Sequence, residues 1–312
     1  TTSGNRAIWE LFQNAGDLAR NGHAEIRITV TDKKFTFAHK GKPFTDDTLR
    51  SLVKQVSSED KENDDTVGQY GTGFLTTHKF GYNIVVNGSM LINENPNVYV
   101  DVKDFLIKRE NYDNIPQFIE DMTDQVDAVG KLMDGIQKLE QQEWTELSYE
   151  LAEGKLSIVQ TAIDEAIKLM PYVLTFNDKI YSCEIIDESR KRHISFSKSP
   201  KKCNVEDLKC TEVTVSEDAI SPKTICCYYL ELHEGNSCII LPLEDESKVC
   251  ALNDVPRMYV HYPLIGHNFF GVNFIFHSHL FTPEEPRDNI IVPKGSEATD
   301  AIAIENKRVL DE

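Results

Sequence analysis

The chain has 312 residues, of which 40% are hydrophobic and 27% are charged, and its formal net charge is -18. This composition is typical of a water-soluble globular protein that is long enough for two domains, each with its own core. The excess of acidic residues excludes broad binding to nucleic acid or to anionic membrane surfaces, because both modes need a basic face. No apolar run reaches the roughly 18 residues of a membrane span and no signal peptide opens the chain, so we expect a cytoplasmic protein with no membrane contact.

The seven cysteines lie between Cys183 and Cys250, and no two of them form a C-x-x-C pair. This irregular, odd-numbered set favours reduced thiols in a cytosolic protein over a disulfide framework or a zinc site. The sequence opens abruptly at T-T-S-G-N-R and stops inside a predicted helix at R-V-L-D-E. We therefore expect a fragment of a longer protein that continues beyond its C-terminus.

The first predicted element is an amphipathic helix over residues 6–20. Glu10, Asn14 and Asp17 are spaced four and three residues apart, so they project from one side of this helix. Amide and carboxylate oxygens are ligands that suit Mg²⁺, and a glutamate in the same row could orient an attacking water. The alternative is a plain amphipathic helix with three polar residues at its edge.

Two glycine-rich turns follow. The segment F-A-H-K-G-K-P-F (residues 37–44) ends a strand and turns at Gly41 and Pro43. The segment G-Q-Y-G-T-G-F (68–74) precedes L-T-T-H-K-F, which we predict to be helical. A glycine-rich turn that feeds a helix presents backbone N–H groups to phosphate oxygens. The pattern is neither a Walker A motif, since no Lys-Ser or Lys-Thr follows, nor a Rossmann fingerprint, since a helix comes first.

The order E-x-x-x-N-x-x-D, G-x-P-F and G-x-x-G-x-G-F resembles the N box and the two glycine boxes of the GHKL, or Bergerat-fold, ATPase superfamily. This superfamily includes gyrase B, histidine kinases and the large heat-shock chaperones. The segments G-T-G-F-L-T-T-H and H-x-G-x-P-F-T most resemble sacsin-like ATPase modules of bacterial ATP-binding proteins. The resemblance continues at residues 144–151, 170–180 and 256–290, and therefore covers most of the chain.

The resemblance implies roles for single residues. Glu10 would be the general base, Asn14 the Mg²⁺ ligand, and Asp17 would face the nucleotide. Gly41 would line the site, and Thr145, at the start of a strand, would help to hold adenine. The remaining matches would form the phosphate cradle: Gly68, Gly71, Gly73 and Phe74.

His39 departs from the superfamily pattern, which has an aspartate there to accept the adenine amino group. A neutral imidazole can accept such a hydrogen bond only in one tautomer. Either His39 binds the base in a different way, or selectivity for adenine is relaxed. A partly buried structural histidine is the alternative.

The predicted fold class is α+β. Residues 1–152 would form a Bergerat-type α/β sandwich that binds ATP, with a polar lid at 57–70 and a helical insertion at 113–142. Residues 153–312 would form an α+β transducer-like domain. In the superfamily a basic side chain of that domain reaches the terminal phosphate, and Arg287 is the first candidate ahead of Lys248 and Lys294. An ion pair of Arg287 with Asp288 or Glu284 is the alternative.

Other elements follow from periodicity and turn residues. Residues 24–31 and 34–38 predict a hairpin, Thr45 caps a helix through Val56, and strands follow at 82–86 and 97–102. The apolar residues of 113–142 have helical spacing and are expected to be core. A helix at 156–169 ends at Pro171, the basic run 190–202 is expected to be a solvated loop, strands continue to about 265, and residues from 296 are helical.

Two functions from different classes remain open. The first is an Mg²⁺-dependent ATPase with slow turnover, a homodimer by resemblance, whose conformational cycle serves a protein partner or an effector domain. Bacterial relatives by resemblance suggest stress or phage defence as its setting. The second is a scaffold that senses ATP without significant hydrolysis. A histidine kinase is a distant third, since no helical segment with a phospho-acceptor histidine precedes the N box.

Overall fold

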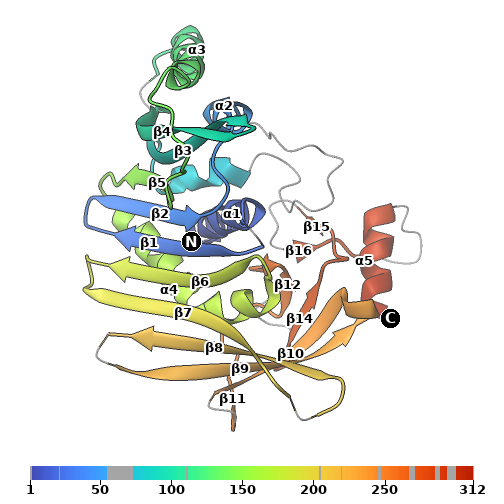
Figure 1. The fold of residues 1–312 in the computed structure, drawn as a ribbon. Helices are drawn as coiled ribbons and strands as arrows, with labels where there is room; N and C mark the ends of the chain where they lie inside the picture. The colour runs from blue at the N-terminus through green and yellow to red at the C-terminus, as the bar shows by residue number, and fades with distance from the viewer. Residues whose placement is uncertain are drawn as a thin grey trace. The chain divides into compact units, whose positions relative to one another are not determined.

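The computed structural model describes residues 2–20, 22–54, 73–109, 112–203, 205–218, 220–244, 247–266, 271–284, 289–293 and 300–311. The chain separates into two compact units (Figure 1). The first contains Thr1–Ala166 and Lys179–Ile194, and the second contains Ile167–Asp178 and Ser195–Glu312. Each unit combines helices with a mixed sheet, so the α+β class is confirmed. The expected domain division after residue 152 stays a prediction.

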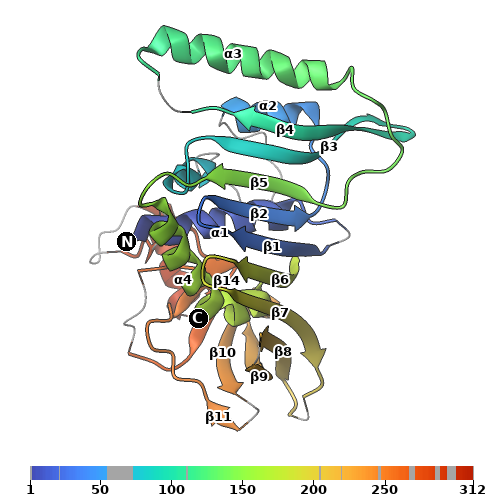
Figure 2. The same cartoon turned by 90° about the vertical axis from the view of Figure 1, so that its left-hand side faces the viewer.

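The first unit is built on strands in the order β6-β1-β2-β5-β3-β4 (Figure 2). β1 and β6 are parallel, and the other neighbouring strands are antiparallel. Every second residue of β1 is buried, which is the period-two pattern behind the predicted hairpin, and that hairpin is confirmed. The strands are β1 (Ala24–Val30), β2 (Lys34–Lys40), β3 (Ile84–Glu94), β4 (Asn97–Ile107), β5 (Thr145–Glu150) and β6 (Ile180–Asp187).

Helix α1 (Thr2–Asp17) packs on this sheet and confirms the first predicted helix. The Phe12 ring is fully buried and meets the Phe37 ring of β2 edge to face, with 5.4 Å between centroids. At its other end α1 lies against the first half of α4 (Lys155–Phe176), since a Cβ on Gly4 would lie 2.8 Å from Ile158 Cγ2. The apolar sides of α1 are thus buried against the sheet and α4. The polar row of the helix, formed by Glu10, Asn14 and Asp17, is left for other contacts.

Two short helices flank the glycine-rich turns. α2 (Asp46–Lys54) begins as predicted, because the Thr45 hydroxyl accepts a hydrogen bond from the Thr48 N–H at 3.1 Å. After the second turn the chain forms a 3-10 helix, η1 (Gly73–Lys79), rather than an α-helix. The Thr76 hydroxyl donates to the Gly73 carbonyl and the Thr77 hydroxyl to the Phe74 carbonyl, both at 2.7 Å, which favours this tighter winding.

The helical insertion differs from its prediction in length and in burial. α3 (Ile115–Leu132) stops at Leu132, because the chain then pairs with the edge of β4, where Tyr99 and Lys138 exchange two backbone hydrogen bonds of 2.8 Å. The expectation of core residues is also wrong, since Val129 is the one buried residue of the helix among those described. α3 lies along α2 and β4 at the edge of the unit (Figure 2), where apolar side chains stay exposed: Ile115, Ile119, Met133, Ile136 and Leu139.

Helix α4 corrects a second prediction, because it continues through Pro171 to Phe176. A proline inside a helix removes one hydrogen bond and costs about 3 kcal/mol. Burial of the residues that follow offsets this cost, since Tyr172, Val173, Leu174 and Phe176 are all buried. The Lys198 ammonium also donates to the carbonyls of Leu174 and Asn177, at 3.1 and 2.6 Å, and so satisfies the end of the helix.

The second unit holds strands in the order β13-β12-β14-β10-β9-β8-β7, with β11 beside β10 and a separate β15-β16 pair. The basic run 190–202 is therefore mostly strand β7, not the expected loop. The strands are β7 (Arg192–Lys201), β8 (Leu208–Glu217), β9 (Ile220–Leu232), β10 (Ser237–Glu244), β11 (Lys248–Val249), β12 (Met258–Val260), β13 (Tyr262–Pro263), β14 (Ile275–Ser278), β15 (Pro283–Glu284) and β16 (Asn289–Ile290). A 3-10 turn, η2 (His233–Gly235), links β9 to β10.

Helix α5 (Ala301–Asp311) confirms the predicted C-terminal helix. Its Asn306 side chain is buried and bonds to the chain beside β15 and β16, accepting from the Thr282 N–H at 2.9 Å and donating to the Ile291 carbonyl at 3.0 Å. A small apolar core lies there, formed by Met258, Val260, Leu264, Phe281, Ile290 and Val309. None of the described helices has the length and apolar character needed to cross a bilayer.

The packing of α1 on β2 can be tested by truncating Phe12. We expect Phe12→Ala to lower the free energy of unfolding by about 3–5 kcal/mol, since it removes a fully buried ring and leaves a cavity. Urea unfolding followed by circular dichroism measures this change. Ile119→Ala on α3, where the side chain is 51% exposed, is the control and should stay within about 0.5 kcal/mol of the parent. Equal effects of the two changes would contradict the described packing.

Candidate functional site

The polar row of α1 is retained in the folded chain. Glu10 is buried and only 7% exposed, and Asn14 and Asp17 are half-buried on the same side of the helix. A buried carboxylate needs a specific surrounding that compensates its lost hydration. The surroundings of Glu10 therefore decide what this row can do.

Gly73 lies directly against the Glu10 carboxylate. A Cβ added at Gly73 would lie 2.0 Å from Glu10 Oε2 and 2.7 Å from Glu10 Cδ, closer than real atoms approach. Any residue other than glycine at position 73 would therefore force the Glu10 carboxylate to move from this place. The fold brings Glu10 of α1 and the end of the second glycine-rich turn into contact, across 63 positions of sequence.

Arg6 is a member of the site that the sequence analysis missed. Its Nε lies 3.3 Å from Glu10 Oε1, one helical turn away. The i to i+4 spacing of a basic and an acidic residue is a visible signal for such a pair. Because Glu10 is buried, the guanidinium stabilises its charge more than a surface ion pair would.

The first glycine-rich turn lies against the other end of α1. The Leu18 carbonyl accepts a hydrogen bond of 2.7 Å from the Lys42 N–H. A Cβ on Gly41 would lie 2.6 Å from that same carbonyl oxygen and 2.9 Å from His39 Nδ1. The Gly41 carbonyl in turn accepts from the Gln141 side chain at 3.0 Å. This turn is therefore held from two sides, and only glycine fits it.

His39 and Thr145 form one cross-strand pair. β2 and β5 are antiparallel and place these residues directly opposite each other, so their side chains share a face of the sheet. Both are buried, at 3% and 6% exposure. Gly88 of β3 lies against Thr145, since a Cβ there would lie 3.2 Å from Thr145 Oγ1, and its φ of +153° suits glycine. The two residues that resemblance assigns to the base therefore lie together.

The His39 ring is neutral. Burial lowers its pKa to about 4, because the imidazolium would lose its hydration. Its Nδ1 atom is buried and has no hydrogen-bond partner within the part of the chain that the structure describes. A neutral ring with an unsatisfied buried nitrogen fits a group that hydrogen-bonds to a polar ligand.

Asp17 also has a protein partner. Its Oδ1 lies 3.4 Å from the Lys179 ammonium, and its side chain is 7% exposed. Lys179 precedes β6 and lies 162 positions away in sequence, so no local pattern could have indicated this pair. The ion pair positions the end of α1 beside the start of β6 and leaves the role of Asp17 toward a ligand as a prediction.

Several predicted site residues lie outside the described residues: Gly68, Gly71, Arg287, Lys294 and the lid at 57–70. Phe74 is described and is buried at the start of η1. Lys248 lies on β11 of the second unit, where its ammonium is 3.5 Å from Glu244 Oε2 and is largely exposed. In the first unit the structure thus brings Glu10 to Gly73, Gly41 to the end of α1, and His39 to Thr145.

No protein-family model and no curated protein matches the sequence. Among solved structures, the chain is similar to the B subunit of the DNA gyrase from Myxococcus xanthus, with a TM-score of 0.34 and 8% sequence identity. The match covers 68% of this chain and 61% of that chain. The chain thus spans less than two thirds of the length of this structure.

The contacts of the first unit define what the site can bind. Asn14 and Glu10 offer oxygen atoms from one side of α1, which suits a hard cation such as Mg²⁺. Backbone N–H groups at the start of η1 suit phosphate oxygens, and the His39–Thr145 pair suits a polar heterocycle. These residues therefore fit a magnesium-bound nucleoside phosphate.

The lowered pKa of His39 predicts a dependence of stability on pH. The unfolded chain, with a histidine pKa of about 6.5, takes up a proton before the folded chain does as pH falls. The stability that neutral His39 contributes is complete above about pH 6.5 and is lost between there and about pH 4. Between about pH 7 and pH 4, we expect the free energy of unfolding to fall by about 3 kcal/mol more in the parent chain than in His39→Gln.

Urea unfolding at a series of pH values measures this difference. His23→Gln is the matched control, because His23 is exposed, and its pH profile should match that of the parent chain. A His39→Gln profile parallel to the parent profile would show that His39 titrates normally in the folded chain.

Proposed function

We propose that the first unit binds ATP together with Mg²⁺ and hydrolyses it slowly. One observation carries the proposal: helix α1 meets both glycine-rich turns, at Gly73 through Glu10 and at Gly41 through the Leu18 carbonyl. The N box therefore contacts the described parts of both glycine boxes, which supports the proposal that the three form one site. This arrangement is what the resemblance to GHKL ATPases implies.

Each described residue takes a role in this proposal. Asn14 would hold Mg²⁺, which would supply positive charge at the phosphates, and backbone N–H groups at the start of η1 would contact the phosphate oxygens. Thr145 and the neutral His39 bind the base. His39 Nδ1, which has no protein partner among the described residues, would accept the adenine amino N–H if its other nitrogen carries the proton.

Glu10 is the proposed general base for hydrolysis. The attacking water forms a bond to the γ-phosphorus, the bond from that phosphorus to the β–γ bridging oxygen breaks, and Glu10 accepts the water proton. Arg6 holds the carboxylate in place and stabilises its charge. Released ADP and phosphate would then relax the turns that α1 contacts, which gives a conformational switch.

The setting of this switch follows from resemblance alone. We propose a homodimer in which ATP turnover acts on a protein partner or an effector domain. A sacsin-like module in bacterial stress or phage defence is the setting that the sequence motifs favour. By the same resemblance, Arg287, which lies outside the described residues, is the first candidate for the basic residue that contacts the terminal phosphate.

A second function, ATP sensing without significant hydrolysis, is favoured by the Arg6–Glu10 pair. The Arg6 Nε lies 3.3 Å from Glu10 Oε1 and so occupies a carboxylate oxygen that would otherwise face the attacking water. In that case Glu10 has a structural role in the site, and binding of the nucleotide, without its hydrolysis, changes the order of the chain.

Turnover by Glu10→Gln separates these two functions. If Glu10 is the base, we expect steady-state phosphate release to fall about a hundredfold or more, while the affinity for ATP changes little. Glu150→Gln, at an exposed position of β5, is the matched control and should keep parent turnover. Equal phosphate release by the parent and by Glu10→Gln would remove Glu10 from the chemistry.

A further inference from the structure

Three histidines of the second unit gather at the end of one strand pair. His277 lies on β14, His279 follows that strand, and His261 lies between β12 and β13. β12 and β14 are parallel neighbours in which Tyr259 is opposite His277. Positions two residues apart share a face of a strand, so His277 and His279 project from the same face. Their assembly thus depends on a pairing between segments that are 16 residues apart.

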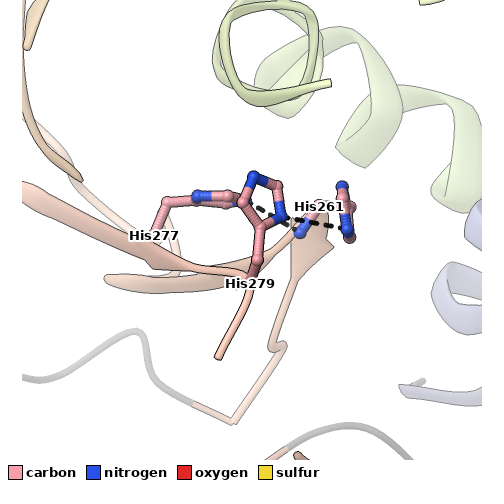
Figure 3. Close-up of side chains that lie close together, drawn as sticks. All are labelled: His261, His277 and His279. Carbon is pink, nitrogen blue, oxygen red and sulfur yellow. Dashed lines mark hydrogen bonds between the residues drawn. The ribbon is translucent and has the colours of Figure 1, made fainter. Parts of the chain in front are cut away.

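The ring nitrogens of these histidines converge on one place. One ligand atom from each residue lies within 4.8 Å of the other two. His279 Nδ1 and His261 Nε2 are 3.1 Å apart, and His277 Nε2 accepts from the His261 backbone N–H at 3.2 Å (Figure 3). The His279 ring centroid lies 4.4 Å from the centroids of both other rings.

This spacing is close to that of a tetrahedral zinc site. With zinc–nitrogen bonds of about 2.0–2.1 Å and tetrahedral angles, two imidazole nitrogens lie about 3.3 Å apart. The His279–His261 separation already has this size, and a metal ion would replace the proton that the two nitrogens share. The longest separation in the group must shrink by about 1.5 Å. His279 is exposed and His261 is half-buried, so both side chains are freer to adjust than the buried His277 ring.

Two features of the surrounding structure position the rings. His261 has a φ of +62°, a left-handed conformation that is uncommon outside glycine and that recurs at functional sites. The buried His277 ring stacks on Phe176 of α4 with 4.6 Å between centroids and 14° between planes. The buried ring is therefore fixed, while the other two lie nearer to solvent.

We propose that His261, His277 and His279 bind one Zn²⁺ ion through one ring nitrogen each. Three imidazoles leave a fourth position, which opens toward the exposed His279 side and can take water or a small anion. The His277 Nε2 lone pair turns from the His261 N–H to the metal. The site lies within the second unit.

Competition with a chromophoric chelator measures zinc binding to the full chain after any oligohistidine tag has been cleaved off. We expect one Zn²⁺ per chain, with affinity reduced more than about tenfold in His279→Ala. His261→Asn is a second variant, because asparagine tolerates the left-handed backbone and keeps the turn. His23→Ala, an exposed histidine of the first unit, is the control and should bind as the parent does.

No zinc binding by the parent chain, or equal binding by the parent and by both cluster variants, would overturn the proposal and leave a hydrogen-bonded histidine group only. Co²⁺ tests the coordination itself. We expect the intense visible absorption of tetrahedral Co²⁺ and a change of that spectrum when azide is added to the open position. A weak octahedral spectrum, or one that azide leaves unchanged, would contradict three protein ligands with an open fourth position.

Discussion

The close approach of Gly73 to the Glu10 carboxylate is the constraint on which the candidate site depends. A Cβ at position 73 would lie 2.0 Å from Glu10 Oε2, so any residue other than glycine there would force the Glu10 carboxylate to move. The same helix supports the first turn at its other end, where the Leu18 carbonyl binds the Lys42 N–H. Because Phe12 is fixed in the core between these contacts, packing on β2 sets the distance between the two turns.

Much of the fold of the first unit could be predicted from local patterns. Alternating burial indicated β1 and β2, a polar cap indicated the start of α2, and apolar spacing indicated α1. The failures have long-range causes. Pro171 is tolerated inside α4 because the residues after it are buried, and residues 133–142 leave the helix because Lys138 pairs with Tyr99. The helical spacing of apolar residues predicted the helix α3, but it could not predict whether those residues are buried.

Sequence motifs indicated some residues of the candidate site. The contacts that form only when distant segments fold together could not be predicted. The spacing of Glu10 and Asn14 and the glycines at 41 and 73 indicated the site, and the register of β2 and β5 then placed His39 opposite Thr145. The partner of Asp17 is Lys179, which only folding brings near. An H-x-H pattern at His277 and His279 was visible in the sequence, but its third member, His261, joins it only through the pairing of β12 with β14.

Calorimetric titration of ATP and GTP, each with and without Mg²⁺, tests most directly whether α1 and the two turns form a nucleotide site. The account predicts binding of ATP that requires Mg²⁺ in the parent chain and is weakened at least about tenfold in Asn14→Ala, as expected when a metal ligand is removed. Asn97→Ala, at an exposed position of β4, should bind as the parent does. Stronger binding of ATP than of GTP would show that His39 and Thr145 select adenine. Absence of any nucleotide binding by the parent, or Mg²⁺-dependent binding that Asn14→Ala leaves unchanged, would contradict the account.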